Sequence, residues 1–370
     1  MIKKIFLVLN IIFIIILVLS YLSPITSPES NSYIPILGLG FPILFIINIF
    51  IIFFWLIFKP LYSILSIVAF LIGFNVSNRY WAHNENNAPI DSTMIKVMSY
   101  NVKNFDVYNY TLDWNYKYET RNKIFDLLKE ENPDILCFQE YYYENTKKFK
   151  TTDTLKTFLK ANHFFAAFPV ENRKSDFFGI AIFTKYQIVN KGKIEFETKG
   201  ANSCIFLDVL INKDTVRIYN LHFESIRFQK HDYEFAQKVS DSLSDQSELK
   251  LKQGARVLFT KLNRAFKYRA KQSELVEEHI KTCKYPTILC GDFNDTPISY
   301  AYKRIYKHLN DAFINAGTGL GTTYAGKIIP AYRIDYIFHS DDFQPFNFNI
   351  IKKQYSDHYP ITCYLKKIEK

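Results

Sequence analysis

Three apolar stretches open the chain, and short apolar segments alternating with amphipathic ones follow them. The stretches cover residues 5–22, 34–58 and 61–76. A membrane-crossing helix needs about 17–25 residues, so the first two are long enough to span a bilayer. The third is marginal at 16 residues and would span only where the bilayer thins or flanking residues help. We predict a transmembrane anchor of two to three helices over residues 1–79.

The orientation of this anchor depends on how many stretches span. A cleaved signal peptide is the alternative for the first stretch, but residues 20–24 carry no small-x-small cleavage site. Lysines beside membrane helices favour the cytoplasmic face. We therefore expect Lys3, Lys4 and Lys59 on that face, and Glu29, in the loop after the first stretch, on the other. If three stretches span, the rest of the chain lies on the extracytoplasmic side, which is our prediction. If only two span, it lies in the cytoplasm.

Residues 94–370 predict one α/β domain, which follows a polar linker over residues 80–93. The segment 119–131 carries apolar side chains at helical spacing and ends before a proline, which stops a helix. The segment 268–281 has the same spacing and leads into an apolar strand. A domain of this length can bury one large core.

Polar side chains recur where the apolar strands end. The run 287–289 leads to Asp292 and Asn294, which point the same way because side chains alternate along a strand. An Asx turn that closes a strand would explain this pair taken alone. Other strand ends, or the loops beside them, repeat the pattern with Asn101, Glu140, Asn220, His222, Asp335, Asp357 and His358. The recurrence predicts one shared site.

Seven ordered motifs resemble those of the endonuclease/exonuclease/phosphatase superfamily, which includes pancreatic deoxyribonuclease, apurinic endonucleases, inositol-polyphosphate 5-phosphatases and neutral sphingomyelinases. The resemblance covers about residues 94–366 and rests on SYNVKNFD (99–106), LCFQE (136–140), GIAIFTKYQI (179–188), YNLHFES (219–225), GDFNDTP (291–297), RIDYIF (333–338) and SDHYP (356–360). It implies a sandwich of two mixed β-sheets flanked by helices, with the site at one edge where strand ends converge.

The resemblance also implies metal-dependent phosphoester hydrolysis and a role for each candidate residue. Glu140 would be the main ligand of Mg²⁺ or Mn²⁺, with Asn101 nearby and Asp357 on the second side of the site. Carboxylate oxygens suit such hard cations. Asp292 would align or deprotonate the attacking water, and Asn294 would hydrogen-bond the phosphoryl oxygens.

Two histidines complete the expected site. Asp335 and His358 resemble a dyad, in which the carboxylate fixes the tautomer of the imidazole and raises its pKa. His222 matches a second histidine that is proposed as general acid in the deoxyribonuclease-like members, although a satisfied structural histidine is the alternative. One residue departs from the pattern: Lys103 stands where apurinic endonucleases carry an acidic residue, which argues against an apurinic-site enzyme.

A Lys-, Arg-, Gln- and Ser-rich segment, residues 224–267, is longer than the corresponding interval of simple nucleases. We predict an insertion with two helices, around 232–242 and 249–266. It would serve either as a solvated cap, or to shape substrate access or touch the membrane.

The net charge of the chain indicates an anionic binding partner. The net charge is +10, of which +3 lies in residues 1–79 and +7 in the rest, which suits a nucleic acid, a phospholipid head group or a membrane surface. The five cysteines form no C-x-x-C pair, so neither a zinc site nor a disulfide framework is indicated.

We predict a membrane-anchored, metal-dependent phosphodiesterase. A nuclease-type enzyme is the first choice, with a phospholipid- or sphingomyelin-type enzyme as the alternative. An inactive binding domain is disfavoured because every expected position holds a competent residue, and no protein partner is predicted.

Overall fold

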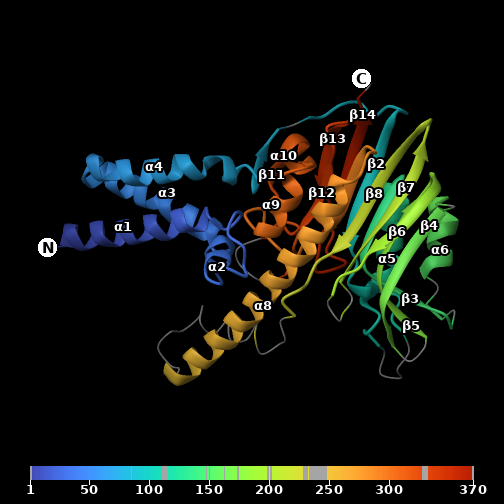
Figure 1. The fold of residues 1–370 in the computed structure, drawn as a ribbon, viewed down its shortest axis with the longest axis horizontal. Coiled ribbons are helices and arrows are strands. Elements are labelled where there is room, and N and C mark those ends of the chain that lie inside the picture. Colours follow the sequence, from blue (N-terminus) through green and yellow to red (C-terminus); the bar gives the residue numbers. More distant parts are fainter. Residues whose placement is uncertain are drawn as a thin grey trace.

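The computed structural model describes residues 2–84, 86–110, 116–146, 148–149, 151–161, 163–172, 175–197, 200, 202–227, 232, 248–326 and 332–368. Two six-stranded sheets form the body of the molecule (Figure 1). In order across the first sheet lie β10 (Asn310–Asp311), β12 (Asp335–His339), β9 (Thr287–Asp292), β8 (Asp214–His222), β7 (Ser203–Ile211) and β6 (Gln187–Ile194). The second has β13 (Phe343–Ile350), β14 (Ile361–Lys367), β2 (Met94–Asn101), β3 (Ile135–Glu144), β5 (Asp176–Thr184) and β4 (His163–Asn172).

Both sheets are mixed, since β8 and β9 pair in parallel, as do β2 and β3, while the other neighbours are antiparallel. The sheets pack face to face through fully buried aliphatic side chains, among them Val97 and Ile135 from one sheet and Ile218 and Ile288 from the other. Alternating β-branched residues supply this core because every second side chain of a strand points the same way. The predicted two-sheet sandwich is confirmed.

Helices cover the outer faces of the sheets. The second sheet carries the 3₁₀ turn η1 (Lys103–Asp106), α5 (Glu119–Glu131) and α6 (Thr151–Leu159), whose apolar faces share one core with β3 and β5. The first sheet carries α8 (Glu248–Lys281) and α9 (Tyr300–Tyr306), and the short α10 (Ala312–Ala316) lies near its β10 edge. α5 has the bounds that its periodicity predicts.

The predicted helices 249–266 and 268–281 are wrong as separate elements, because α8 runs through both without a break. Lys267 and Tyr268 lie between them, and neither residue type interrupts a helix. The helix predicted around 232–242 lies outside the described residues, Asp232 excepted.

The N-terminal region forms a helical bundle of α1 (Ile2–Ser20), α2 (Ile34–Leu39), α3 (Phe41–Phe58) and α4 (Pro60–Ser77). Figure 1 shows α1, α3 and α4 projecting from the sheets, with the N-terminus at the far end. α3 and α4 are long and apolar enough to cross a membrane, whereas the apolar part of α1, Lys4–Ser20, is shorter. The stretch 34–58 is therefore two helices, divided at Gly40.

The bundle buries a set of polar side chains and exposes many of its large apolar ones. Its interior holds Asn10, Asn48 and Ser66, one from each long helix: Ser66 Oγ donates to Asn10 Oδ1 (3.0 Å), and Asn48 Nδ2 donates to the Ser66 carbonyl (2.9 Å). Large apolar side chains such as Phe50 and Leu61 are instead exposed. A water-soluble bundle has the opposite arrangement, and interhelical polar contacts of this kind occur between membrane helices.

A tight joint connects the bundle to the sheets. Arg79 lies two residues after the end of α4, donates from Nη1 to the Pro297 carbonyl (3.1 Å), and lies over the rings of Tyr302 and Tyr306. β1 (Trp81–His83) then pairs with β11 (Thr318–Leu320). The segment predicted as a linker thus begins with an ordered strand.

Candidate active site

Strand register brings the candidate residues of the first sheet together. Asp292, the last residue of β9, lies opposite His222 at the end of the parallel strand β8. On its other side it lies opposite Asp335, the first residue of the antiparallel strand β12. Three predicted residues from distant sequence positions therefore occupy adjacent strand positions.

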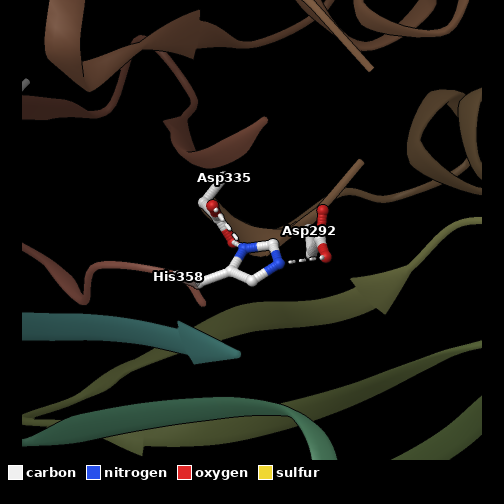
Figure 2. Close-up of side chains that lie close together, drawn as sticks. All are labelled: Asp292, Asp335 and His358. Atoms are coloured by element: carbon white, nitrogen blue, oxygen red, sulfur yellow. Dashed lines mark hydrogen bonds and ion pairs between the residues drawn. The ribbon is translucent and has the colours of Figure 1, made fainter. Parts of the chain in front are cut away.

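His358 lies between two buried carboxylates (Figure 2). Its Nδ1 is 2.9 Å from Asp335 Oδ2, and its Nε2 is 3.7 Å from Asp292 Oδ2. Burial alone would lower the pKa of His358, but Asp335 and Asp292 together raise it to about 10. His358 is thus a cation at neutral pH, with Asp335 holding the imidazole from one side.

Asp292 is fully buried and hydrogen-bonded at both oxygens. Oδ2 accepts from Asn101 Nδ2 (2.9 Å), and Oδ1 accepts from the Asn294 backbone N–H (2.7 Å). Burial raises the pKa of Asp292 to about 6, although the His358 charge opposes this shift. A carboxylate that ionises near neutrality is suited to accept a proton.

His222 is buried with neither ring nitrogen hydrogen-bonded to any described residue. Its Nε2 lies 3.6 Å from Asp292 Oδ2 and 4.0 Å from Glu140 Oε1. Burial lowers its pKa, with Asp292 acting in the opposite direction. Because a buried polar atom without a partner is costly, this imidazole is fitted to meet a ligand or water in the site.

Glu140 occupies a β-bulge. The pairing of β3 with β5 shifts between Phe138 and Tyr141, and Glu140 between them has a left-handed φ of 50°. A bulge redirects a side chain from the regular alternation, and here the Glu140 side chain remains 31% exposed. Burial of its surroundings raises the pKa of Glu140, and the nearby Asp357 adds to the shift.

Asp357 is similarly half-exposed, and its Oδ2 lies 3.2 Å from Lys103 Nζ. Lys103 begins η1, whose four residues all have left-handed φ angles. The lysine that departs from the apurinic-endonuclease pattern therefore places its charge directly beside a predicted metal ligand.

The Asn101 side chain lies between the carboxylates of Asp292 and Glu140 and hydrogen-bonds both. Besides its bond to Asp292, Nδ2 donates to Glu140 Oε1 (3.4 Å), while Oδ1 accepts from the Lys103 N–H (3.1 Å). A metal contact would use Oδ1, which here already has a donor, so the role of Asn101 as a metal ligand stays a prediction.

Asn294 likewise has a left-handed φ of 51°, a conformation that asparagine tolerates. Its side-chain Nδ2 donates to the Phe223 carbonyl (3.0 Å). One amide proton remains for a phosphoryl oxygen, because an NH₂ group has two.

Sequence reasoning missed Arg269 of α8. This buried guanidinium donates to the Asn294 carbonyl, and its Nε lies 3.0 Å from Asp295 Oδ2. It supports the loop that carries Asp292 and Asn294. An arginine within the predicted helix 268–281 was visible, but a helical arginine is ordinarily a surface residue.

Two donor sets are consistent with a metal. The ligand atoms of Asp292, Asp335 and His358 all lie within 4.8 Å of one another. His358 Nδ1 is already hydrogen-bonded to Asp335, which leaves Nε2 as the ring atom that could contact a metal. Glu140 and Asp357 are more exposed acidic oxygens, which fits Mg²⁺ because that ion keeps several waters and takes one or two carboxylates.

The chain belongs to the Endonuclease/Exonuclease/phosphatase family, whose sequence profile matches residues 98–358. Members of this family hydrolyse phosphoester bonds and typically use a divalent metal. Residues 3–80 match a second profile, a domain of unknown function. No match was found among curated proteins.

Solved structures show the same fold. A humanized Danio rerio TDP2 aligns with a TM-score of 0.50 and 16% identity over 74% of this chain and 99% of that chain. An endonuclease/exonuclease/phosphatase from Beutenbergia cavernae aligns with a TM-score of 0.50 and 15% identity over 74% of this chain and 72% of that chain. Identities this low establish the architecture alone.

Proposed function

We propose that this protein is a membrane-anchored, divalent-metal-dependent phosphodiesterase whose catalytic domain, residues 94–370, lies on the extracytoplasmic side. The main support for this reaction is the buried arrangement in which His358 lies between Asp335 and Asp292, with Asp292 hydrogen-bonded to Asn101. It combines a cation for the phosphate with a carboxylate for the water.

Each residue has a distinct task in this proposal. Glu140 and Asp357, with Asn101 nearby, would hold Mg²⁺ or Mn²⁺, which when bound neutralises negative charge on the phosphate oxygens. Asp292 orients the attacking water and accepts its proton. His358, His222 and Asn294 donate to the phosphoryl group and the leaving oxygen, and Asp335 holds His358 in place.

The bundle supports membrane anchorage. Its exposed apolar surface and its internal Asn10–Ser66–Asn48 contacts suit lipid surroundings. Lys4 is in the first turn of α1, and Lys59 lies between α3 and α4. Figure 1 shows the start of α1 at the end of the bundle distant from the sheets. Basic residues favour the cytoplasm, so three crossings by α1, α3 and α4 leave the catalytic domain on the opposite side.

A nuclease-type substrate remains our first candidate, supported by the basic charge of the domain. One contact favours a lipid phosphodiester as the second. Arg79, two residues after the end of α4, donates to the carbonyl of Pro297, which is five residues from Asp292. Since a chain extends about 3.5 Å per residue at most, the candidate base lies within roughly 18 Å of the joint.

The test uses the full chain in detergent micelles with three substrates: a soluble aryl phosphodiester, plasmid DNA, and mixed phospholipid–sphingomyelin vesicles. We expect hydrolysis of at least one, with Mg²⁺ or Mn²⁺ required. Full activity in excess chelator would refute the metal mechanism, and inactivity on all three would refute the proposed phosphodiesterase.

A further inference from the structure

The first turns of α8 extend beyond the domain core. No side chain from Lys252 to Thr260 is buried, and buried positions begin at Leu262. We call the exposed segment Lys252–Phe259 the α8 overhang. Figure 1 shows this part of α8 projecting from the sheets on the same side as α1, α3 and α4.

Two contacts place α8 beside the end of the bundle, and the first of them involves the overhang. The Tyr33 ring, at the start of α2, lies 5.3 Å from the Phe259 ring. Further along α8, Lys271 Nζ lies 3.2 Å from Glu29 in the loop between α1 and α2. The overhang therefore begins at the level where the chain turns between its apolar helices and, at about 1.5 Å per residue, reaches roughly 10 Å beyond Tyr33.

The side chains at this level are mixed apolar and basic. The overhang carries Arg256 together with the consecutive apolar residues Val257, Leu258 and Phe259. In the neighbouring α1–α2 loop, Ile25 and Tyr33 are 68% and 69% exposed. Basic residues beside apolar and aromatic ones are typical of helices that lie at a membrane interface.

We propose that the α8 overhang lies in the head-group layer of the bilayer that holds the bundle, with anionic phospholipids as its partner. This inference rests on the proposed membrane anchorage. Two features support it: continuity with the exposed apolar surface of the bundle, and the complementarity between the Arg256 charge and anionic head groups.

The overhang would also connect the membrane with the site. Ten residues after Phe259, the same helix supplies Arg269, which holds the loop of Asp292 and Asn294. Together with the Arg79 joint, a seated α8 would attach the domain to the bilayer at two separate points.

Site-directed fluorescence can locate the overhang. In a Cys283→Ser background, the four other cysteines are buried, and single cysteines replace Phe50, Gln253 or Leu275. Each full-length variant is labelled with a small thiol-reactive fluorophore and reconstituted into anionic vesicles that contain two kinds of spin-labelled lipid, one labelled near the head group to reach Gln253 and one labelled deep in the acyl chain to reach Phe50, which lies in the middle of α3. Leu275 is the matched control, because it is an exposed position on α8 22 residues after Gln253, about 33 Å along the helix.

We expect quenching at Phe50 and Gln253, the latter by roughly half of its intensity, and little at Leu275. Quenching at Phe50 without quenching at Gln253 would overturn the inference and leave the anchor standing. No quenching at Phe50 would overturn the anchor itself. Equal quenching at Gln253 and Leu275 would also overturn the inference, because it would mean unspecific adsorption of the domain.

Reversing the charge of Arg256 tests whether anionic phospholipid is the partner of the overhang. Arg256→Glu should weaken quenching at Gln253, whereas Lys281→Glu, at the far end of the same helix, should not. If Arg256→Glu leaves the quenching unchanged, anionic lipid is not the partner.

Discussion

The Asn101 side-chain amide donates to the Asp292 carboxylate across the boundary between the two sheets. Asn101 ends β2 of one sheet, Asp292 ends β9 of the other, and the hydrogen bond measures 2.9 Å. The relative position of the sheets therefore sets the geometry of the candidate site. Variants that shift one sheet against the other should impair catalysis before they unfold the protein.

Glu140→Ala should reduce phosphodiester hydrolysis by about 10²-fold or more. The variant lacks the carboxylate that would hold the metal ion, and without that ion the negative charge on the phosphate oxygens is not neutralised. Initial rates across a Mg²⁺ titration measure this effect. Glu130→Ala is the matched control, since Glu130 is an exposed acid of α5 that pairs with Lys353 (2.7 Å). Equal rates in the two variants would remove Glu140 from the metal site.

His358→Ala and Asp292→Asn should each lower turnover by on the order of 10²-fold or more, as loss of acid–base groups does. Both residues lie at loop or strand ends, so circular dichroism should show folded protein. A near-normal rate in either variant would exclude that residue from the proposed mechanism.

The pH profile of kcat/KM should fall on the acid side through about pH 6. Asp292 must be ionised to accept a proton, and burial raises its pKa to about 6, so activity is present above that value and lost below it. Because His358 and Asp292 interact, the measured limb belongs to the pair. Profiles from pH 4 to 11 should also fall near 10, where His358 loses its proton.

Asp335→Asn should move that alkaline limb toward neutral pH by about one to three units, because the substitution takes away a charge that raises the pKa of His358. A merely structural role for Asp335 would lower the rate without moving the limb. An unchanged limb would therefore argue against the dyad.

Arg333→Met should destabilise the fold by about 3–5 kcal/mol, since it leaves a buried carboxylate without its partner. Arg333 and Asp311 are both buried, with Nη1 and Oδ1 3.0 Å apart. Denaturant unfolding in detergent measures the change. Lys123→Met is the control, because Lys123 and its partner Glu119 are both exposed (52% and 78%) and such pairs contribute about 0–1 kcal/mol; equal losses would contradict the argument.

A reporter fused after Lys370 tests the topology. Alkaline phosphatase should be active there and a green fluorescent protein dark, because three crossings with Lys3, Lys4 and Lys59 inside put the C-terminal domain outside. The reverse pattern would mean an even number of crossings.

The sequence by itself determined the fold class and the candidate residues. Period-two apolar runs that end in Asn101, Glu140 or Asp292 predict strands and their polar ends, since side-chain alternation is a local property of the chain. Helical spacing within 119–131 likewise sufficed for α5. These features depend on residues only a few positions apart.

The tertiary structure alone decided how those residues meet. The Asn101–Asp292 bond joins positions 191 residues apart, and the Arg79–Pro297 bond joins positions 218 apart. The left-handed bulge at Glu140 and the buried support from Arg269 also follow from packing against other elements. Local patterns carry no information about such partners, because their free energy arises only once the sheets and the bundle are brought together.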